Sequence, residues 1–399
     1  MIHADGGVLM VGGIAAEELA ARYGMPAYVY DAATIRATYR EVRDSFRWSP
    51  TRIHFASVCN PNLHLLRILR DEGAGLHANT PGDVFCGLRA GFRAEDIVFS
   101  GSNVSEDDLR FLVGAGVAIN VDSLDDLRRA VTVAPGRSFG VRIHLEEVLP
   151  ESRIGLREHE LDEALAMAAR AGSKLESVHI YCGTHGRSLD RYRRAIARLI
   201  AHAARLPDLA CINLGGGFGY DYHDSAATFP FKTLADIVEG EVAQLAAARG
   251  RAITLRAEPG RAIVAGAGVL LTRVLSVKRA QKRRYIGVDT TVANFTSHAV
   301  HGHHRRVVAV GARPPAADVA DLCGCTTYSR DVIAHDVPLG EVGVGDLVGV
   351  LDAGAYGYCM AGHFLNRPAP PELFVDDGVV TVATRRETFE DLVRLQPAS

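Results

Sequence analysis

Short apolar runs alternate with longer amphipathic segments over most of the first two thirds of the chain. Eight of these runs have the length and apolar content of buried strands: RIHFA, AGLHA, DIVFSG, AINVD, FGVRIH, LESVHIYC, ACINLG and ITLRAE. The segments between them, such as NLHLLRILRDEG and SLDDLRRAVTVA, carry apolar residues at the i, i+3 and i+4 spacing of a half-buried helix. We therefore expect parallel βα units.

Eight such units favour a closed (β/α)8 TIM barrel, and an open doubly wound sheet is the competing interpretation. After about residue 265 the pattern changes to short runs rich in Val, Leu and Ile, such as GVLLTRVLSVKR and DLVGVLDAG, which predict strands. AYVYDAATIRATYREVRDSF, near the start, predicts one strand followed by the first long helix. We expect a barrel over residues 33–265 and a sandwich-like or barrel-like β domain over residues 1–32 and 266–399.

The composition is that of an ordinary globular protein, with 48% hydrophobic residues, 23% charged residues and a net charge of −3. That balance argues against nucleic-acid binding, and no apolar run is long enough to predict a membrane span. The first residues, MIHADGGVLMVGG, lack the pattern of a signal peptide, so we predict a cytoplasmic protein. The seven cysteines show no paired C-x-x-C sets, so no structural metal is predicted.

The chemistry of a βα barrel lies at the C-terminal ends of its strands. There the predicted strands place Val58-Cys59-Asn60, His77-Ala78-Asn79, Ser100-Gly101, Asp122, His144, the segment 179–184, the segment 215–217 and Glu258. Polar residues and glycines are concentrated at these ends, where a purely structural strand end needs neither. This pattern favours a functional barrel mouth.

Three motifs stand out, and each has a plain structural alternative. The glycines of NLGGGFGY let backbone N–H groups approach an anion, although a tight turn has the same composition. In EPGR, Glu258 could pair with a protonated ring nitrogen while Gly260 and Arg261 hold a phosphate; a structural Arg–Glu pair is the alternative. Tyr356 of LDAGAYGY could reach a phosphate, but alone this motif is a turn.

The segment TSHAVHGHHRR places four histidines within seven residues. Such spacing in one predicted loop suits a substrate site or a chance metal site. No second cluster accompanies it, so we predict no metal, and a solvated polar loop is the most common outcome.

Together, GGG, EPGR and DAGAYG, in this order and spacing, resemble the fold-type III pyridoxal-phosphate decarboxylases, which include the diaminopimelate and ornithine decarboxylases. The resemblance covers nearly the whole chain and is closest to the diaminopimelate decarboxylases. It implies an alanine-racemase-like barrel with a β domain, pyridoxal phosphate as the cofactor, and a homodimer with shared sites. It assigns Glu258 to the pyridine nitrogen and Cys325 to the partner's site. The implied phosphate contacts are Gly215, Gly216, Gly217, Gly260, Arg261, Tyr356 and Thr184.

The chain departs from the family pattern at the aldehyde end and the substrate end. The family's Y-A-x-K-A-N-x-N becomes F-A-S-V-C-N-P-N, which places Val58 at the Schiff-base lysine. A family aspartate falls on His77. In H-x-H-x-G-S the first histidine is His179, and the ring-stacking second histidine becomes Tyr181. The arginine and tyrosine of R-P-x-L-Y, which form a substrate site, become Ser297 and His301.

The chain has only four lysines, and none precedes residue 174, so shifting the alignment does not restore the missing lysine. We therefore predict pyridoxal phosphate held non-covalently and decarboxylase-type chemistry on an amino-acid-like metabolite of a specialised pathway. Two alternatives stay open: a non-catalytic, ligand-binding pseudoenzyme, and a cofactor-independent enzyme that uses the anion pocket with His and Cys acid–base groups. The candidate catalytic residues are His77, Cys59, Tyr181 and Cys325, with His185 as a further proton carrier.

Overall fold

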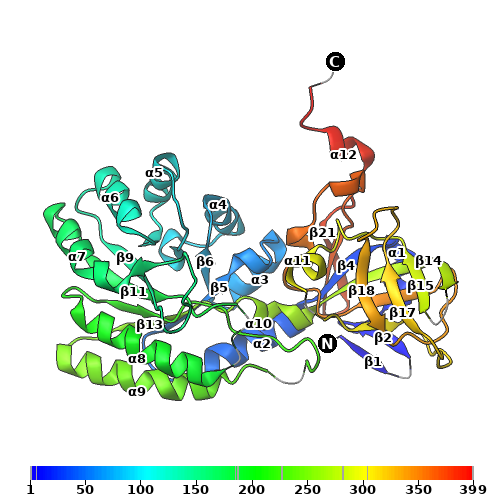
Figure 1. Cartoon of the computed structure of the whole chain (residues 1–399), viewed down its shortest axis with the longest axis horizontal. Coiled ribbons are helices and arrows are strands. Elements are labelled where there is room, and N and C mark those ends of the chain that lie inside the picture. The colour runs from blue at the N-terminus through cyan, green and yellow to red at the C-terminus, as the bar shows by residue number, and fades with distance from the viewer. Residues whose placement is uncertain are drawn as a thin grey trace. The chain divides into compact units, whose positions relative to one another are not determined.

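The computed structural model describes residues 2–5, 7–184, 186, 188–225, 228–280, 283–302 and 304–397. Their contacts divide the chain into two compact units (Figure 1). The barrel unit comprises residues 38–220 and 228–262, and the β unit comprises residues 1–37, 221–227 and 263–399. His185, one of the predicted proton carriers, lies outside the described residues.

The barrel unit contains a closed barrel of eight strands that pair in parallel. Closure is shown at two places: the last strand pairs with the first, Leu255 opposite Thr51, and the fourth pairs with the fifth, Val121 opposite Val141. The predicted TIM barrel is confirmed, and an open sheet is excluded. In order around the barrel the strands are β5 (Thr51–Ala56), β6 (Gly75–Ala78), β7 (Ile97–Phe99), β8 (Ala118–Val121), β9 (Phe139–His144), β11 (Leu175–Ile180), β12 (Cys211–Asn213) and β13 (Thr254–Ala257). A short strand, β10 (Leu156–Arg157), pairs with β9.

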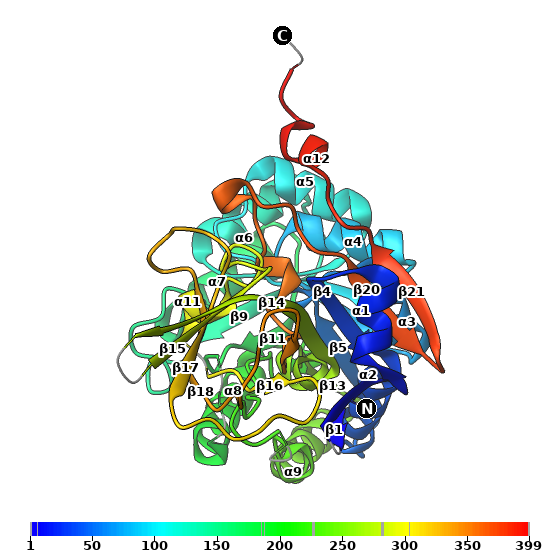
Figure 2. The ribbon, with the colours of Figure 1, turned by 90° about the vertical axis from the view of Figure 1, so that its right-hand side faces the viewer.

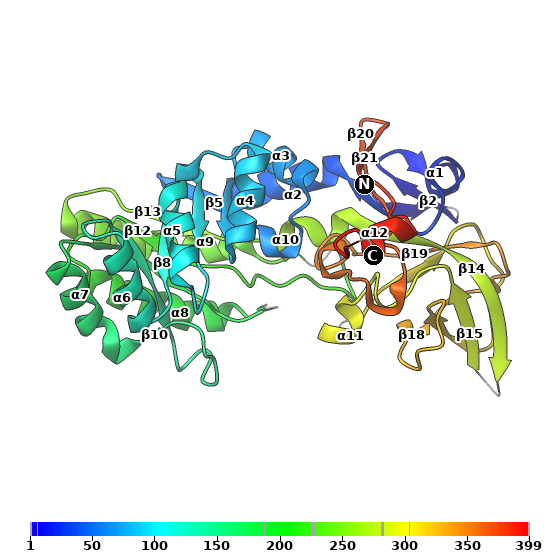
Figure 3. The ribbon, with the colours of Figure 1, turned by 90° about the horizontal axis from the view of Figure 1, so that it is seen from above.

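Helices follow the strands and pack beside their sequence neighbours, as Figure 3 shows for the run from α4 to α7. Local signals in the sequence set their ends. Ser105 and Ser123 accept hydrogen bonds from backbone N–H groups as N-caps, and Gly91 and Gly116 end two helices in the left-handed conformation. The helices are α2 (Ala32–Asp44), α3 (Leu63–Asp71), α4 (Pro81–Ala90), α5 (Glu106–Ala115), α6 (Leu124–Val133), α7 (Leu161–Arg170), α8 (Leu189–Arg205) and α9 (Phe231–Arg249).

The barrel strands are buried on both faces, and small residues make room for large ones across them. His54 on β5 lies opposite Gly75 on β6, and a Cβ on Gly75 would come within 2.5 Å of the His54 ring. Three 3-10 turns complete the unit, and the first of them follows β5 directly and carries Val58. They are η1 (Ser57–Cys59), η2 (Ala94–Asp96) and η3 (Glu158–Glu160).

The β unit is built on β14 (Gly268–Ala280), a long strand that pairs with three others (Figure 2). The N-terminal strand β4 (Ala27–Asp31) lies between β14 and β20 (Glu372–Asp376), so the first residues complete this unit as expected. Its other strands are β1 (His3–Asp5), β2 (Val8–Val11), β3 (Ile14–Ala15), β15 (Arg283–Val288), β16 (Val307–Ala309), β17 (Val319–Cys323), β18 (Val332–Val337), β19 (Leu347–Val350) and β21 (Val379–Thr384).

Helices of the β unit are short, and one of them corrects an expectation. The histidine-rich segment was predicted as a loop, but it contains α11 (Ser297–His301). The prediction missed this helix because five residues are too few to show a helical repeat. The remaining helices and turns are α1 (Ala16–Tyr23), α10 (Arg261–Val264), α12 (Phe389–Val393), η4 (Ala265–Ala267), η5 (Tyr358–Met360) and η6 (Phe364–Asn366). Over the described part of the chain, no helix is both long and apolar enough to cross a membrane.

Candidate active site

A buried carboxylate lies at the C-terminal ends of four barrel strands. Glu258, directly after β13, is only 1% exposed. Its Oε1 accepts a hydrogen bond from Asn213 Nδ2 at 2.7 Å, and its Oε2 accepts one from His179 Nε2 at 3.1 Å. Nε2 of His77 lies 3.3 Å from Oε2. β6, β11, β12 and β13 thus bring together residues as far apart in sequence as 77 and 258.

The surroundings of Glu258 keep it ionised. Burial by itself raises the pKa of this carboxyl, but the nearby His77 and His179 and the hydrogen bonds from His179 and Asn213 outweigh burial, so the pKa is well below its usual range. Desolvation acts in the opposite sense on His77 and lowers its pKa, because burial disfavours the charged imidazolium. The site therefore combines a fixed anion with a histidine that is neutral at neutral pH.

The two histidines stack at the barrel mouth, with ring centroids 6.4 Å apart and an interplanar angle of 22°. His179 is only 2% exposed and His77 only 6%. Nδ1 of both rings is buried without a hydrogen-bond partner in the described structure. Buried polar atoms of this kind cost stability unless a ligand or an ordered water satisfies them, which is typical of a binding site.

The glycine loop after β12 packs against the end of β11 and the loop that follows it. Gly215 has φ +65°, and a Cβ there would lie 2.0 Å from the Ile180 carbonyl oxygen. Gly217 has φ +85°, and a Cβ would lie 1.9 Å from the Gly183 carbonyl oxygen. Only glycine fits such close approach of backbone to backbone.

Asn213 joins this loop to Glu258, a role the sequence analysis missed. Its Oδ1 accepts from the Gly215 N–H at 2.9 Å while its Nδ2 donates to Glu258. The Glu258 N–H donates in turn to the Gly215 carbonyl at 2.8 Å. One asparagine therefore fixes both the carboxylate and the glycine loop, and its place two residues before the glycine run is the sequence signal for it.

The EPGR segment lies beside the turn that carries Val58. The Ala56 N–H donates to the Pro259 carbonyl at 3.1 Å, and a Cβ on Gly260 would lie 3.0 Å from Cys59 Sγ. Arg261, at the start of α10, is 5% exposed. Cys59 is buried with its Sγ 3.1 Å from the Ala56 carbonyl oxygen, whereas Val58 is 40% exposed.

Tyr181 and Thr184 meet at the end of β11, where their hydroxyl oxygens lie 2.6 Å apart. Tyr181 is half-buried and Thr184 exposed. The two residues assigned to different roles in the sequence analysis thus share one hydrogen bond.

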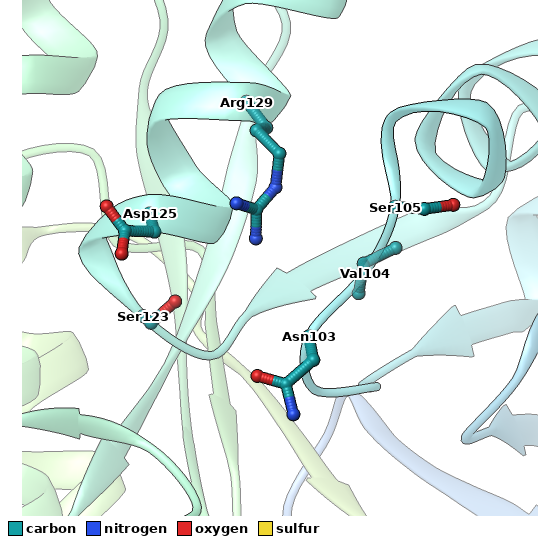
Figure 4. Close-up of a pocket in the computed structure, with 6 residues that line it drawn as sticks. All are labelled: Asn103, Val104, Ser105, Ser123, Asp125 and Arg129. Atoms are coloured by element: carbon teal, nitrogen blue, oxygen red, sulfur yellow. The ribbon is translucent and has the colours of Figure 1, made fainter.

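A second buried polar network, which includes the predicted strand-end residues Ser100, Gly101 and Asp122, lies at the ends of β7, β8 and β9. Arg142 donates through Nε to Asp122 at 2.6 Å and to the Ser100 and Gly101 carbonyls at 3.0 and 2.9 Å. Residues next to this network line a cavity of about 410 Å³. Figure 4 shows Arg129 extending from α6 towards the loop that carries Asn103 and Val104. The cavity is lined by Asn103, Val104, Ser105, Ser123, Asp125 and Arg129.

Four predicted site residues belong to the β unit. His301 and Tyr356 lie close together, with ring centroids 5.7 Å apart. Ser297 Oγ accepts a hydrogen bond from Arg305 at 2.8 Å. Cys325 is half-buried, and burial raises the pKa of its thiol. In the described ranges, no three His, Cys, Asp or Glu side chains are grouped so that they could hold a metal ion.

Known proteins resemble the chain over its full length. It is 33% identical to the diaminopimelate decarboxylase of Methanothermobacter thermautotrophicus, covering 98% of this chain and 96% of the relative. It is also 33% identical to that of Pseudomonas aeruginosa, covering 96% and 95%. The diaminopimelate decarboxylase of Helicobacter pylori, solved in complex with L-lysine, superimposes with a TM-score of 0.88 at 27% identity, covering 95% and 98%.

The fold agrees even more closely with the M. jannaschii diaminopimelate decarboxylase, at a TM-score of 0.92 and 24% identity, covering 100% of this chain and 98% of that one. Residues 32–265 match the family described as pyridoxal-dependent decarboxylase, pyridoxal binding domain. These residues include the Glu258 carboxylate, the glycine loop and Arg261. The chain therefore belongs to the pyridoxal-dependent decarboxylase family.

Proposed function

We propose that this protein is a carbon–carbon lyase of the decarboxylase type that holds pyridoxal phosphate at the barrel mouth without a covalent bond to lysine. Its substrate is an amino acid or amino-acid-like metabolite of a specialised pathway. The observation that carries the proposal is the contrast between a complete set of polar contacts around Glu258 and an aliphatic side chain, Val58, on the adjoining turn.

The residues present fit the phosphate and the ring nitrogen of this cofactor. The Gly215 N–H already donates to Asn213, but Gly216 and Gly217 carry no side chains that would cover their backbone N–H groups. Arg261 supplies a guanidinium, and both features suit a phosphate dianion. Glu258, held ionised by its neighbours, suits a protonated ring nitrogen. When bound, pyridoxal phosphate supplies an electron sink for the electrons left behind by a departing carboxylate.

No lysine of the described barrel unit takes the place of Val58. Lys174 precedes β11, at the end of the barrel opposite the site, and its Nζ pairs with Asp208 at 2.9 Å. Lys232 is exposed near the start of α9. Binding therefore depends on the phosphate and ring contacts alone, and we propose that Tyr181 and Cys59 move the protons that a lysine would otherwise carry.

The remaining assignments rest on the resemblance and stay predictions. They are phosphate contacts from Tyr356 and Thr184, a substrate site at Ser297 and His301, and a homodimer in which Cys325 reaches the partner's site. The bound L-lysine of the Helicobacter pylori relative supports an amino-acid substrate. Because Ser297 and His301 replace an arginine and a tyrosine, we propose that the substrate differs from diaminopimelate.

A ligand-binding protein without turnover is the second candidate, and the aliphatic Val58 is the observation that favours it. Release of carbon dioxide distinguishes the two. Purified protein with added pyridoxal phosphate is given a panel of carboxyl-labelled amino acids, including meso-diaminopimelate, lysine and ornithine. The proposal predicts turnover of at least one substrate, with loss of turnover in Arg261→Met.

Arg128→Met serves as the matched control, because Arg128 is exposed on α6 and pairs with Asp125 three residues away on the same helix. This variant is expected to keep full activity. Tight binding of pyridoxal phosphate with no carbon dioxide from any substrate would favour the second candidate. Turnover that does not depend on added cofactor would contradict both.

A further inference from the structure

His77 is placed to contact one charged group directly, and that group is the carboxylate of Glu258. Its side chain is 8% exposed, and its Nε2 lies 3.3 Å from Glu258 Oε2 without the alignment of a hydrogen bond. Its Nδ1 is also buried and has no hydrogen-bond partner in the described structure. A proton added to this ring would therefore be stabilised mainly by Glu258.

The other charged and titratable groups that interact with His77 already have other partners or are kept neutral by burial. Asp83 caps α4 by accepting from the Thr80 N–H and hydroxyl. Arg142 is paired with Asp122 at 2.6 Å. His179 donates to the same Oε2 of Glu258. His54, which interacts electrostatically with His77 and Glu258, is buried, and burial and Arg256 lower its pKa so that the ring stays neutral.

The single negative charge of Glu258 can thus neutralise one cation. Two buried cations sharing one carboxylate would leave a net positive charge in a desolvated site, which is costly. We propose that His77 is a positioning residue whose protonated form competes with a cationic ring nitrogen for Glu258, so that acidification weakens binding of a ring-nitrogen cofactor. This inference rests on the proposed function, since it concerns the same pocket.

The lowered pKa of His77 agrees with this competition, because the ring stays neutral and leaves Glu258 available at neutral pH. The histidine takes up its proton from solvent as the pH falls, and no covalent step is involved. A carboxylate in place of His77 would have no such effect, because it cannot become a cation.

The test compares two ligands over pH by equilibrium binding to the full chain. The first is pyridoxal phosphate, and the second is deazapyridoxal phosphate, in which a C–H replaces the ring nitrogen while the phosphate is unchanged. Between about pH 8 and about pH 5.5, wild-type affinity for pyridoxal phosphate should fall further than affinity for the deaza compound, by at most about ten-fold because the pKa of His77 is lowered. In His77→Gln the two falls should become equal. Equal falls in wild type, or an unchanged difference in His77→Gln, would overturn the inference.

A second measurement does not depend on the variant. Histidine NMR of the wild-type protein should show His77 protonating at lower pH with pyridoxal phosphate bound than with the deaza compound bound. An identical His77 titration with both ligands would overturn the inference while leaving the proposed function intact. If neither ligand binds at any pH, the proposed function itself fails, and this inference fails with it.

Discussion

At the scale of single residues, the site depends on one buried carboxylate and the donors around it. Glu258 receives Asn213 and His179 as hydrogen-bond donors and His77 at 3.3 Å, and all four residues come from strand ends of the barrel. A buried charge is tolerated only where such partners compensate for the loss of water. Removing the charge therefore tests the arrangement directly.

Glu258→Gln should lower the free energy of unfolding by about 1–3 kcal/mol, because the amide cannot accept from both sides as the carboxylate does. Urea unfolding at neutral pH measures this change. Glu95→Gln is the matched control: Glu95 is exposed and pairs with Arg93 on the surface, so a change below about 0.5 kcal/mol is expected. Equal effects of the two substitutions would show that Glu258 is not held as described.

His54 gives a prediction for acid stability. Burial, with Arg256 nearby, depresses its pKa well below the ordinary value, so the unfolded chain binds a proton that the folded chain refuses. Stability is then full above the unfolded pKa of about 6.5 and falls as the pH drops below it, by up to about 1.4 kcal/mol per pH unit for this group. Replacing His54 with glutamine should flatten the fall measured by urea unfolding between about pH 7.5 and about pH 5.5.

His159→Gln provides the comparison, since His159 is exposed on η3. That variant should keep the wild-type pH dependence. A His54→Gln protein whose stability falls as steeply as that of the wild type would show that His54 does not resist protonation in the folded state.

At the scale of elements, backbone packing at the strand ends forms the proposed phosphate pocket. The glycine loop touches the carbonyls of Ile180 and Gly183, and the EPGR segment touches the turn of Val58 and Cys59. These contacts join loops that follow β5, β11, β12 and β13. The shape of the pocket therefore depends on how these four strands align with one another in the barrel.

Gly217→Ala should displace the loop, because the new methyl group would lie 1.9 Å from the Gly183 carbonyl oxygen at a φ of +85°. We expect affinity for pyridoxal phosphate to fall by about ten-fold or more, measured by equilibrium dialysis. Gly240→Ala is the control, because Gly240 lies within α9 with no atom near the new methyl group. This control should bind normally and gain about 0.5–1 kcal/mol of stability.

Sequence alone predicted the elements that carry long, regular patterns and the motifs that carry unusual glycines. The eight barrel strands and the EPGR and GGG segments were found in this way. The role of Asn213 was missed because an asparagine whose side chain bonds the backbone two residues on is also typical of an ordinary turn. The contact between His77 and Glu258 could not be predicted. These two residues lie 181 positions apart in the chain, and their contact depends on how their strands align around a closed barrel.

At the scale of the whole molecule, the chain resembles its relatives over nearly its whole length. The relatives are matched over more than nine tenths of both chains. The proposed non-covalent binding depends on the prediction that Val58, on the turn after β5, stands at the position of the family's lysine. Retention of the surrounding pocket together with loss of the amine is the central claim.

Borohydride reduction followed by peptide mass spectrometry tests that claim most directly. Wild-type protein and Val58→Lys are each incubated with pyridoxal phosphate, reduced, digested and mapped. The account predicts no cofactor-modified lysine in the wild type beyond the level of a heat-unfolded control, and near-complete modification at position 58 in the variant. Stoichiometric modification of a single native lysine in the folded wild type, or an unmodified lysine at position 58 in the variant, would contradict it.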